Sequence, residues 1–115
     1  MKNTESALNT QIRSDATKQG ARLFRNNTGV FFTKSGRRVR TGLAVGSPDL
    51  VGWIPTKITP EMIGKTLAVF YGVEAKTGKL KLTTQQRRFL QKLKNDGGVA
   101  VVARGTADNY IFEEV

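Results

Sequence analysis

A narrow apolar stripe with helical spacing runs through the N-terminal part of the chain. Leu8, Ile12 and Ala16 recur every four residues, which places them on one side of a helix over about Glu5 to Lys18. Thr4 or Asn3 can cap its start, and Gly20 can end it. Glu5 shares the inward side of the stripe. An acid in the first turn is also what the helix dipole favours, and on spacing alone this second interpretation is the better one.

The clearest helical pattern covers Thr83 to Asn95 and ends at Gly97-Gly98. Its apolar stripe consists of Phe89, Leu90 and Leu93. Thr83 is the N-cap candidate, and Gln86 follows at the spacing of a capping box. Projected on a helix, Gln86 also falls near the middle of the stripe. We therefore expect Gln86 to face the sheet, and both the capping interpretation and a role in a site stay open for it.

Shorter apolar runs, separated by glycine, asparagine and proline, predict strands. Asn26-Asn27-Thr28-Gly29 predicts a turn between the first two strands, and Gly46-Ser47-Pro48 predicts another. The tail after Gly105 allows a short helix capped by Thr106 or an edge strand at Tyr110 to Phe112. The predicted strands are Ala21 to Arg25, Val30 to Thr33, Val39 to Val45 (or an extended loop), Asp49 to Trp53, Thr66 to Lys76, and Val99 to Arg104 parallel to the preceding one, with one helical turn at Pro60 to Ile63.

The longest of these strands ends in two charges. From Val69 it is apolar on both faces, as expected of a buried central strand, until Glu74 and Lys76, which share a face because they are two residues apart. Charged groups are rarely buried unless they are paired, bound to metal or used in chemistry. A second acid, Asp49, follows the turn at Gly46 to Pro48 and opens another apolar run. Asp49, Glu74 and Lys76 are therefore the candidate site.

Charge and composition narrow the chemistry. The 115 residues predict one domain, and 19 Lys+Arg against 9 Asp+Glu give a net charge of +10. This excess predicts an anionic partner, and nucleic acid fits best, although a basic chain can also be merely soluble. The densest basic cluster is predicted to lie on a turn, where it can contact phosphates or form a solvated hairpin tip. It consists of Lys34, Arg37, Arg38 and Arg40.

The chain contains no histidine and no cysteine, which excludes histidine-dependent triads, disulfides and most zinc sites. Any metal must then have oxygen ligands, which indicates Mg²⁺ or Mn²⁺. Two carboxylates can hold such an ion, and a nearby lysine can orient water and stabilise developing charge. This set predicts a phosphodiester-hydrolysing site. Without a membrane-spanning run or a signal-peptide core, we expect a cytoplasmic protein with no membrane partner.

In combination, the motifs resemble a known family. Gly46-Ser47-Pro48-Asp49-Leu50, Glu74-Ala75-Lys76 and Thr83 to Leu90, with the turn at Arg25 to Gly29, are similar to the PD-(D/E)xK nuclease superfamily. More narrowly, they resemble its virus-type replication-repair nuclease (VRR-NUC) domain, over nearly the whole chain from Glu5 to Arg104. The resemblance implies an α/β fold with a mixed central β-sheet flanked by helices, the restriction-endonuclease-like core.

The resemblance also implies roles for the site residues. Asp49 and Glu74 would be metal ligands, with the main-chain carbonyl of Ala75 as a third ligand and Lys76 as the catalytic lysine. Gln86 matches the helix glutamine of the family, and Glu5 matches a first-helix acid that can contribute to metal or water binding.

Single-domain members of the family resemble nucleases of branched DNA, including Holliday-junction resolvases that act as dimers in DNA repair, because two matched cuts need two symmetric sites. We expect such an endonuclease, a homodimer from a bacterial or phage-infected cell. A flap nuclease or exonuclease with the same site, and a non-catalytic basic nucleic-acid-binding module, remain alternatives. The residues expected to bind DNA are Lys34, Arg37, Arg38, Arg40, Lys79, Lys81, Arg87 and Arg88.

Overall fold

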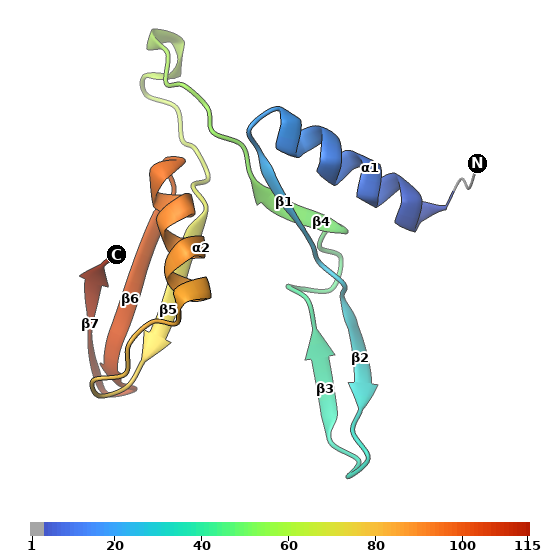
Figure 1. The fold of residues 1–115 in the computed structure, drawn as a ribbon, viewed down its shortest axis with the longest axis vertical. Helices are drawn as coiled ribbons and strands as arrows, with labels where there is room; N and C mark the ends of the chain where they lie inside the picture. The colour runs from blue at the N-terminus through green and yellow to red at the C-terminus, as the bar shows by residue number, and fades with distance from the viewer. Residues whose placement is uncertain (1–3) are drawn as a thin grey trace. The chain divides into compact units, whose positions relative to one another are not determined.

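The computed structural model describes residues 4–115 and divides the chain after Ile54 into two compact units, each described here by itself. Within these residues, two α-helices and small sheets confirm the mixed α/β class (Figure 1). The strands of residues 4–115 form three separate sheets, so the one central sheet and the single domain over 1–115 stay predictions. The elements are α1 Glu5–Lys18, β1 Arg22–Arg25, β2 Gly29–Phe32, β3 Arg38–Thr41, β4 Leu50–Trp53, a 3₁₀ turn Pro60–Met62, β5 Tyr71–Lys76, α2 Thr84–Asn95, β6 Val99–Thr106 and β7 Asn109–Glu114.

Helix α1 of the first unit has the predicted bounds. Thr4 caps it, since its Oγ1 accepts a hydrogen bond from the Ala7 amide at 3.1 Å; the alternative cap, Asn3, lies outside the described residues. The predicted inward face is wrong for this unit, because Leu8 and Ile12 are exposed and so is Glu5. The reason is that α1 packs against β1, and the two-stranded β1–β4 ladder is too narrow to cover the stripe.

The strands of the first unit pair in an order that the turn prediction did not give. β1 pairs antiparallel with β4, and β2 pairs antiparallel with β3. Asn26 to Thr28 therefore connects two ladders instead of reversing the chain, and the prediction of a turn there is wrong. The chain reverses between Thr33 and Arg37, whose backbones are joined by a 2.9 Å hydrogen bond. Asn26 makes no local turn because its side chain bonds across to residues 43–48.

The second unit contains a three-stranded sheet in the order β5-β6-β7, with α2 joining β5 to β6 (Figure 1). β5 and β6 are parallel, as predicted, and β6 and β7 are antiparallel. The edge-strand prediction for the tail is confirmed, and a short helix capped by Thr106 is wrong. The 3₁₀ turn at Pro60–Met62 also matches its prediction.

Strand β5 is shorter and more exposed than predicted. It starts at Tyr71, and the segment from Thr66 to Phe70 lies outside the strands of the described chain. Tyr71 and Val73 are exposed, so β5 is not buried on both faces in this unit. The small core explains why: Leu90, Leu93, Ala100 and Val102 are buried where α2 packs on the sheet, and β5 is an edge strand of it.

Candidate active site

The candidate site of the second unit begins with the close packing of α2 on β5. Gly72, Glu74 and Lys76 alternate with exposed residues and so share one face of the strand. A Cβ atom on Gly72 would lie 2.9 Å from Cδ2 of Leu93, which means that glycine lets the helix approach this strand closely. Leu93 is fully buried at this contact. Gln86 lies two turns before Leu93 on the same side of α2, where it reaches Glu74.

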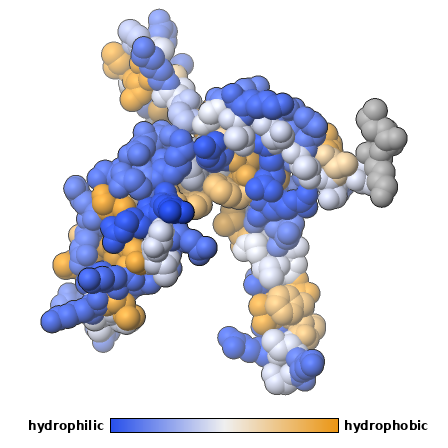
Figure 2. Space-filling model, in the orientation of Figure 1, coloured by the Kyte–Doolittle hydropathy of each residue, from blue (hydrophilic) through white to orange (hydrophobic). Residues whose placement is uncertain are grey.

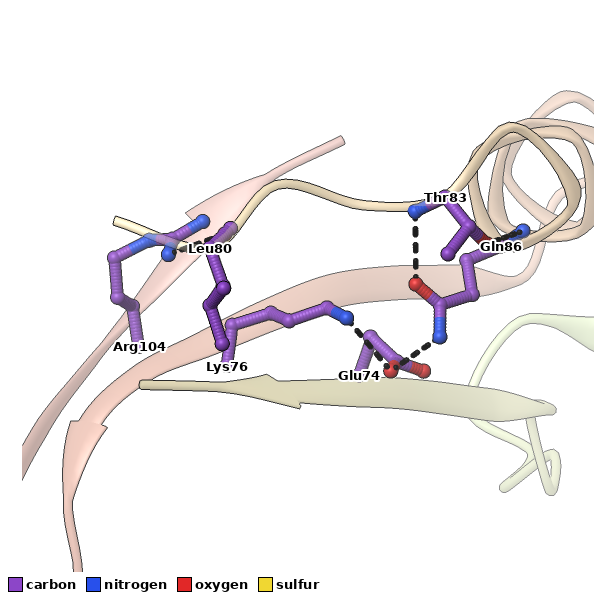
Figure 3. Close-up of polar contacts among 6 residues, drawn as sticks. All are labelled: Glu74, Lys76, Leu80, Thr83, Gln86 and Arg104. Carbon is purple, nitrogen blue, oxygen red and sulfur yellow. Dashed lines mark hydrogen bonds and ion pairs between the residues drawn. The ribbon is translucent and has the colours of Figure 1, made fainter. Parts of the chain in front are cut away.

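Gln86 joins the start of α2 to the Glu74 carboxylate. Its side-chain Nε2 donates to Glu74 Oε1 at 2.9 Å, while its Oε1 accepts from the Thr83 amide at 3.0 Å (Figure 3). The Gln86 amide donates to Thr83 Oγ1 at 3.1 Å, which completes the predicted capping box. The capping interpretation of Gln86 is confirmed. The same amide group also contacts the Glu74 carboxylate, and its role in a site stays a prediction.

Glu74 and Lys76 lie on the same face, as their spacing predicted. Lys76 Nζ is 3.8 Å from Glu74 Oε1, and the side chains are 15% and 31% exposed, respectively. A partly exposed pair at this distance contributes under about 1 kcal/mol to stability. Both contacts of Glu74 use Oε1, which leaves Oε2 without a protein partner in the described chain. The carboxylate thus presents an open oxygen beside an ammonium group.

Arg104, which sequence reasoning missed, fixes the loop between β5 and α2. Its Nη1 donates to the carbonyls of Gly78 at 2.9 Å and Leu80 at 2.8 Å, and its Nε donates to Glu113 Oε1 at 2.8 Å (Figure 3 draws the Leu80 contact). Arg104 is in register with Lys76 on the neighbouring strand. The signal in the sequence was an arginine at the end of an otherwise apolar run.

Asp49 lies in the first unit, exposed, directly before β4. The backbone there is held by Asn26, a buried residue that sequence reasoning took for part of a turn. Asn26 Nδ2 donates to Ser47 Oγ at 2.7 Å and to the Pro48 carbonyl at 2.8 Å, and its Oδ1 accepts from the Leu43 amide at 2.8 Å. The Asn26 amide donates to the Asp49 carbonyl at 2.8 Å. One asparagine therefore fixes the Pro-Asp turn.

The structure brings together Glu74, Lys76 and Gln86 in the second unit. Asp49 and Glu5 belong to the first unit, where Glu5 occupies the first turn of α1. The residues predicted to bind DNA are all exposed: Lys34, Arg37, Arg38 and Arg40 in and around the turn that joins β2 to β3, Lys79 and Lys81 after β5, and Arg87 and Arg88 in α2.

The donor atoms of this region suit a hard cation. Glu74 Oε2 is open, and a carboxylate oxygen is a ligand that hard cations prefer. Mg²⁺ commonly takes one or two protein carboxylates and completes its shell with water and substrate phosphate. Among residues 4–115, the structure groups no three acidic side chains as a ready metal cage. The oxygen donors present fit Mg²⁺ or Mn²⁺ in the partly hydrated mode.

The second unit thus places a carboxylate, an ammonium and an amide together near the end of β5, in a chain with a net charge of +10. The chain belongs to the VRR-NUC domain family, whose model matches residues 3–107. This membership implies a nuclease-type function and an interaction with DNA. The curated proteins and the solved structures gave no match. Neither α-helix in residues 4–115 has the length and apolarity needed to cross a membrane.

Proposed function

We propose that the protein is a metal-dependent DNA endonuclease with a PD-(D/E)xK core and a mixed central β-sheet, a single nuclease domain over residues 1–115. The observation that carries the proposal is the arrangement of Glu74, whose Oε1 is held by Gln86 and Lys76 while its Oε2 is open. A carboxylate held in this way is oriented before substrate arrives, which is what catalysis by positioned charge requires. Family membership supports the nuclease class.

The proposed ligands for Mg²⁺ or Mn²⁺ are Asp49, Glu74 and the main-chain carbonyl of Ala75. The bound ion would supply polarisation of the phosphoryl group and a more acidic water. Lys76 would place its ammonium beside the scissile phosphate and stabilise charge that develops there. Gln86 would keep Glu74 oriented. Glu5 would support metal or water binding.

The proposed substrate is branched DNA, such as a four-way junction, cut by a homodimer that supplies two sites related by symmetry. The net charge of +10 and the exposed basic residues support DNA as the partner. Analytical ultracentrifugation and cleavage of four-way, flap and fully paired substrates of equal length test the dimer and the preference. Faster cutting of flaps or free ends would instead identify a flap nuclease or exonuclease.

The central experiment replaces Lys76 with alanine and measures cleavage of a labelled four-way junction with Mg²⁺ or Mn²⁺. Loss of a group that stabilises developing charge commonly costs about 100-fold to 1,000-fold in rate, and we expect a loss of that size. Asp49→Asn should lower cleavage and weaken Mn²⁺ binding measured by calorimetry. Lys57→Ala, which removes one exposed lysine outside the site, is the charge-matched control.

Two results would contradict the proposal. The first is a folded Lys76→Ala protein that cuts as fast as the wild type. The second is wild-type protein that binds DNA with a steep salt dependence but does not cut it with either metal, which would identify a binding module.

A further inference from the structure

The β2–β3 hairpin of the first unit carries an unusual surface. In the described chain its two strands pair only with each other. Its turn is well ordered by hydrogen bonds: the Thr33 amide donates to the Arg37 carbonyl at 2.9 Å, and Thr33 Oγ1 accepts from the Arg37 amide at 3.1 Å. The hairpin is therefore a preformed ribbon.

Three consecutive apolar side chains of this ribbon are exposed within their unit. They are Val30, Phe31 and Phe32, and Phe32 has the largest exposed fraction, 68%. Figure 2 shows hydrophobic surface along the hairpin and hydrophilic side chains toward its tip. Burial of a phenylalanine side chain is worth about 2–3 kcal/mol, and a phenylalanine that is exposed within its unit forgoes this gain. An exposed apolar patch rimmed by polar groups indicates a binding surface.

The strand register mixes these apolar groups with guanidinium groups. Val30 is opposite Arg40, and Phe32 is opposite Arg38. Directly opposed residues point to the same face, so this face alternates apolar side chains and arginines. Residues 29–41 also include Lys34 and Arg37 and contain no aspartate or glutamate. The surface therefore suits a partner that offers both flat apolar groups and negative charge.

We propose that the β2–β3 hairpin binds unpaired nucleotides, with a base stacked on Phe32 and flanking phosphates held by Arg38 and Arg40. Bases offer the flat apolar surface and phosphates the charge, and such stacking on aromatic side chains is how proteins hold single strands. A paired duplex hides its base faces, so the hairpin would favour DNA with open bases at a branch. A second copy of the hairpin fits poorly, because it would set four cations against four. This inference rests on the proposed function and specifies its substrate.

Binding is measured in EDTA, so that no cleavage occurs and a failure of the nuclease proposal leaves the measurement intact. The probes are a fluorescein-labelled branched DNA with a five-nucleotide gap and a fully paired duplex of equal length. We expect Phe32→Ala to weaken binding to the gapped DNA about tenfold and binding to the duplex less than about twofold, with an unchanged salt slope because no charge is lost. Phe32→Trp keeps an aromatic ring and should bind the gapped DNA about as well as the wild type. Phe112→Ala, which truncates an exposed phenylalanine of β7, should leave binding to both DNAs at the wild-type level.

Two further measurements sharpen the test. 2-Aminopurine placed in the gap should be quenched by the wild type and by Phe32→Trp but not by Phe32→Ala. Arg38→Ala should weaken both DNAs and reduce the salt slope by about one. Equal losses on both DNAs for Phe32→Ala, or no loss, would overturn the proposal. The proposal would also be overturned if Phe32→Ala quenched 2-aminopurine as strongly as the wild type and converted a dimer to a monomer. That result would identify the hairpin as an interface between copies.

Discussion

The two units fix their proposed catalytic carboxylates in different ways. In the second unit Glu74 lies on a strand beneath α2, where close packing at Gly72 and Leu93 places Gln86 against it. In the first unit Asp49 lies directly before β4, and hydrogen bonds from Asn26 to Pro48 and Asp49 hold the backbone. One acid is thus placed by apolar packing and the other by a buried polar network.

The difference shows which kind of change should disturb each acid. A substitution at a packed contact affects both the strand and the helix that share it, because protein interiors are close-packed and relax only in part. A polar network fails locally, because the loss of one partner leaves specific amides and carbonyls unpaired. Substitutions in the second unit should therefore affect stability first, and substitutions at Asn26 should affect the geometry of the Pro-Asp turn first.

The largest effect on stability is expected for Leu93→Ala. Leu93 of α2 is fully buried against β5, and truncation of a buried leucine costs about 2–5 kcal/mol. Thermal unfolding should show the loss, and hydrogen exchange should speed up in β5 and β6 more than in β1 and β4. Leu67→Ala, at an exposed leucine of the same unit, is the control. An equal loss of protection in both units would show that the two do not respond separately.

Next comes Asn26→Ala. It removes three side-chain hydrogen bonds and leaves the Leu43 amide without its acceptor, which costs about 1–3 kcal/mol. We expect Mn²⁺ binding and cleavage to fall together, while Asn27→Ala, at the neighbouring exposed asparagine, changes neither. Calorimetry and a junction-cleavage assay measure the two quantities. A destabilised variant that keeps wild-type metal affinity and cleavage would show that Asn26 does not position Asp49.

Part of the second unit could be predicted from the sequence. Leu93 and Gln86 were predictable, because helical spacing alone puts both on the buried side of α2, and the capping box fixes where that helix begins. The parallel pairing of β5 and β6 followed from the crossover helix between them.

Asn26 was not predictable, because its role depends on partners 17 to 22 residues away in the chain. Local composition made the same residue look like a turn former. The role of Arg104 was not predictable for a related reason, because its contacts with Gly78 and Leu80 arise only when β6 lies beside β5. The overlong prediction for β5 came from apolar residues whose burial sequence alone could not decide. The roles of Asp49, Glu74 and Lys76 remain predictions that the experiments above test.

A smaller effect is expected when a methyl group is added at the closest helix–strand contact. Gly72→Ala puts a Cβ 2.9 Å from Leu93 Cδ2, the end of a flexible side chain that can shift. We expect a cost of about 1 kcal/mol from overpacking and a modest loss of cleavage as α2 moves away from Glu74. The double variant Gly72→Ala/Leu93→Met, measured by thermal unfolding, should recover part of the stability. If the single variant is as stable and active as the wild type, close approach is not what positions Gln86.

An equally small stability effect should come from Thr83 and Gln86, where the two functions of the Gln86 side-chain amide can be separated. Thr83→Ala removes a helix cap, which costs about 1 kcal/mol, but leaves the Gln86–Glu74 hydrogen bond in place. Gln86→Met keeps the size of the side chain and removes both contacts. Stability should therefore fall by similar amounts in the two variants, while cleavage should fall much more in Gln86→Met. If instead Thr83→Ala loses as much cleavage as Gln86→Met, the glutamine acts by fixing the start of α2, and its contact with Glu74 adds nothing to the site.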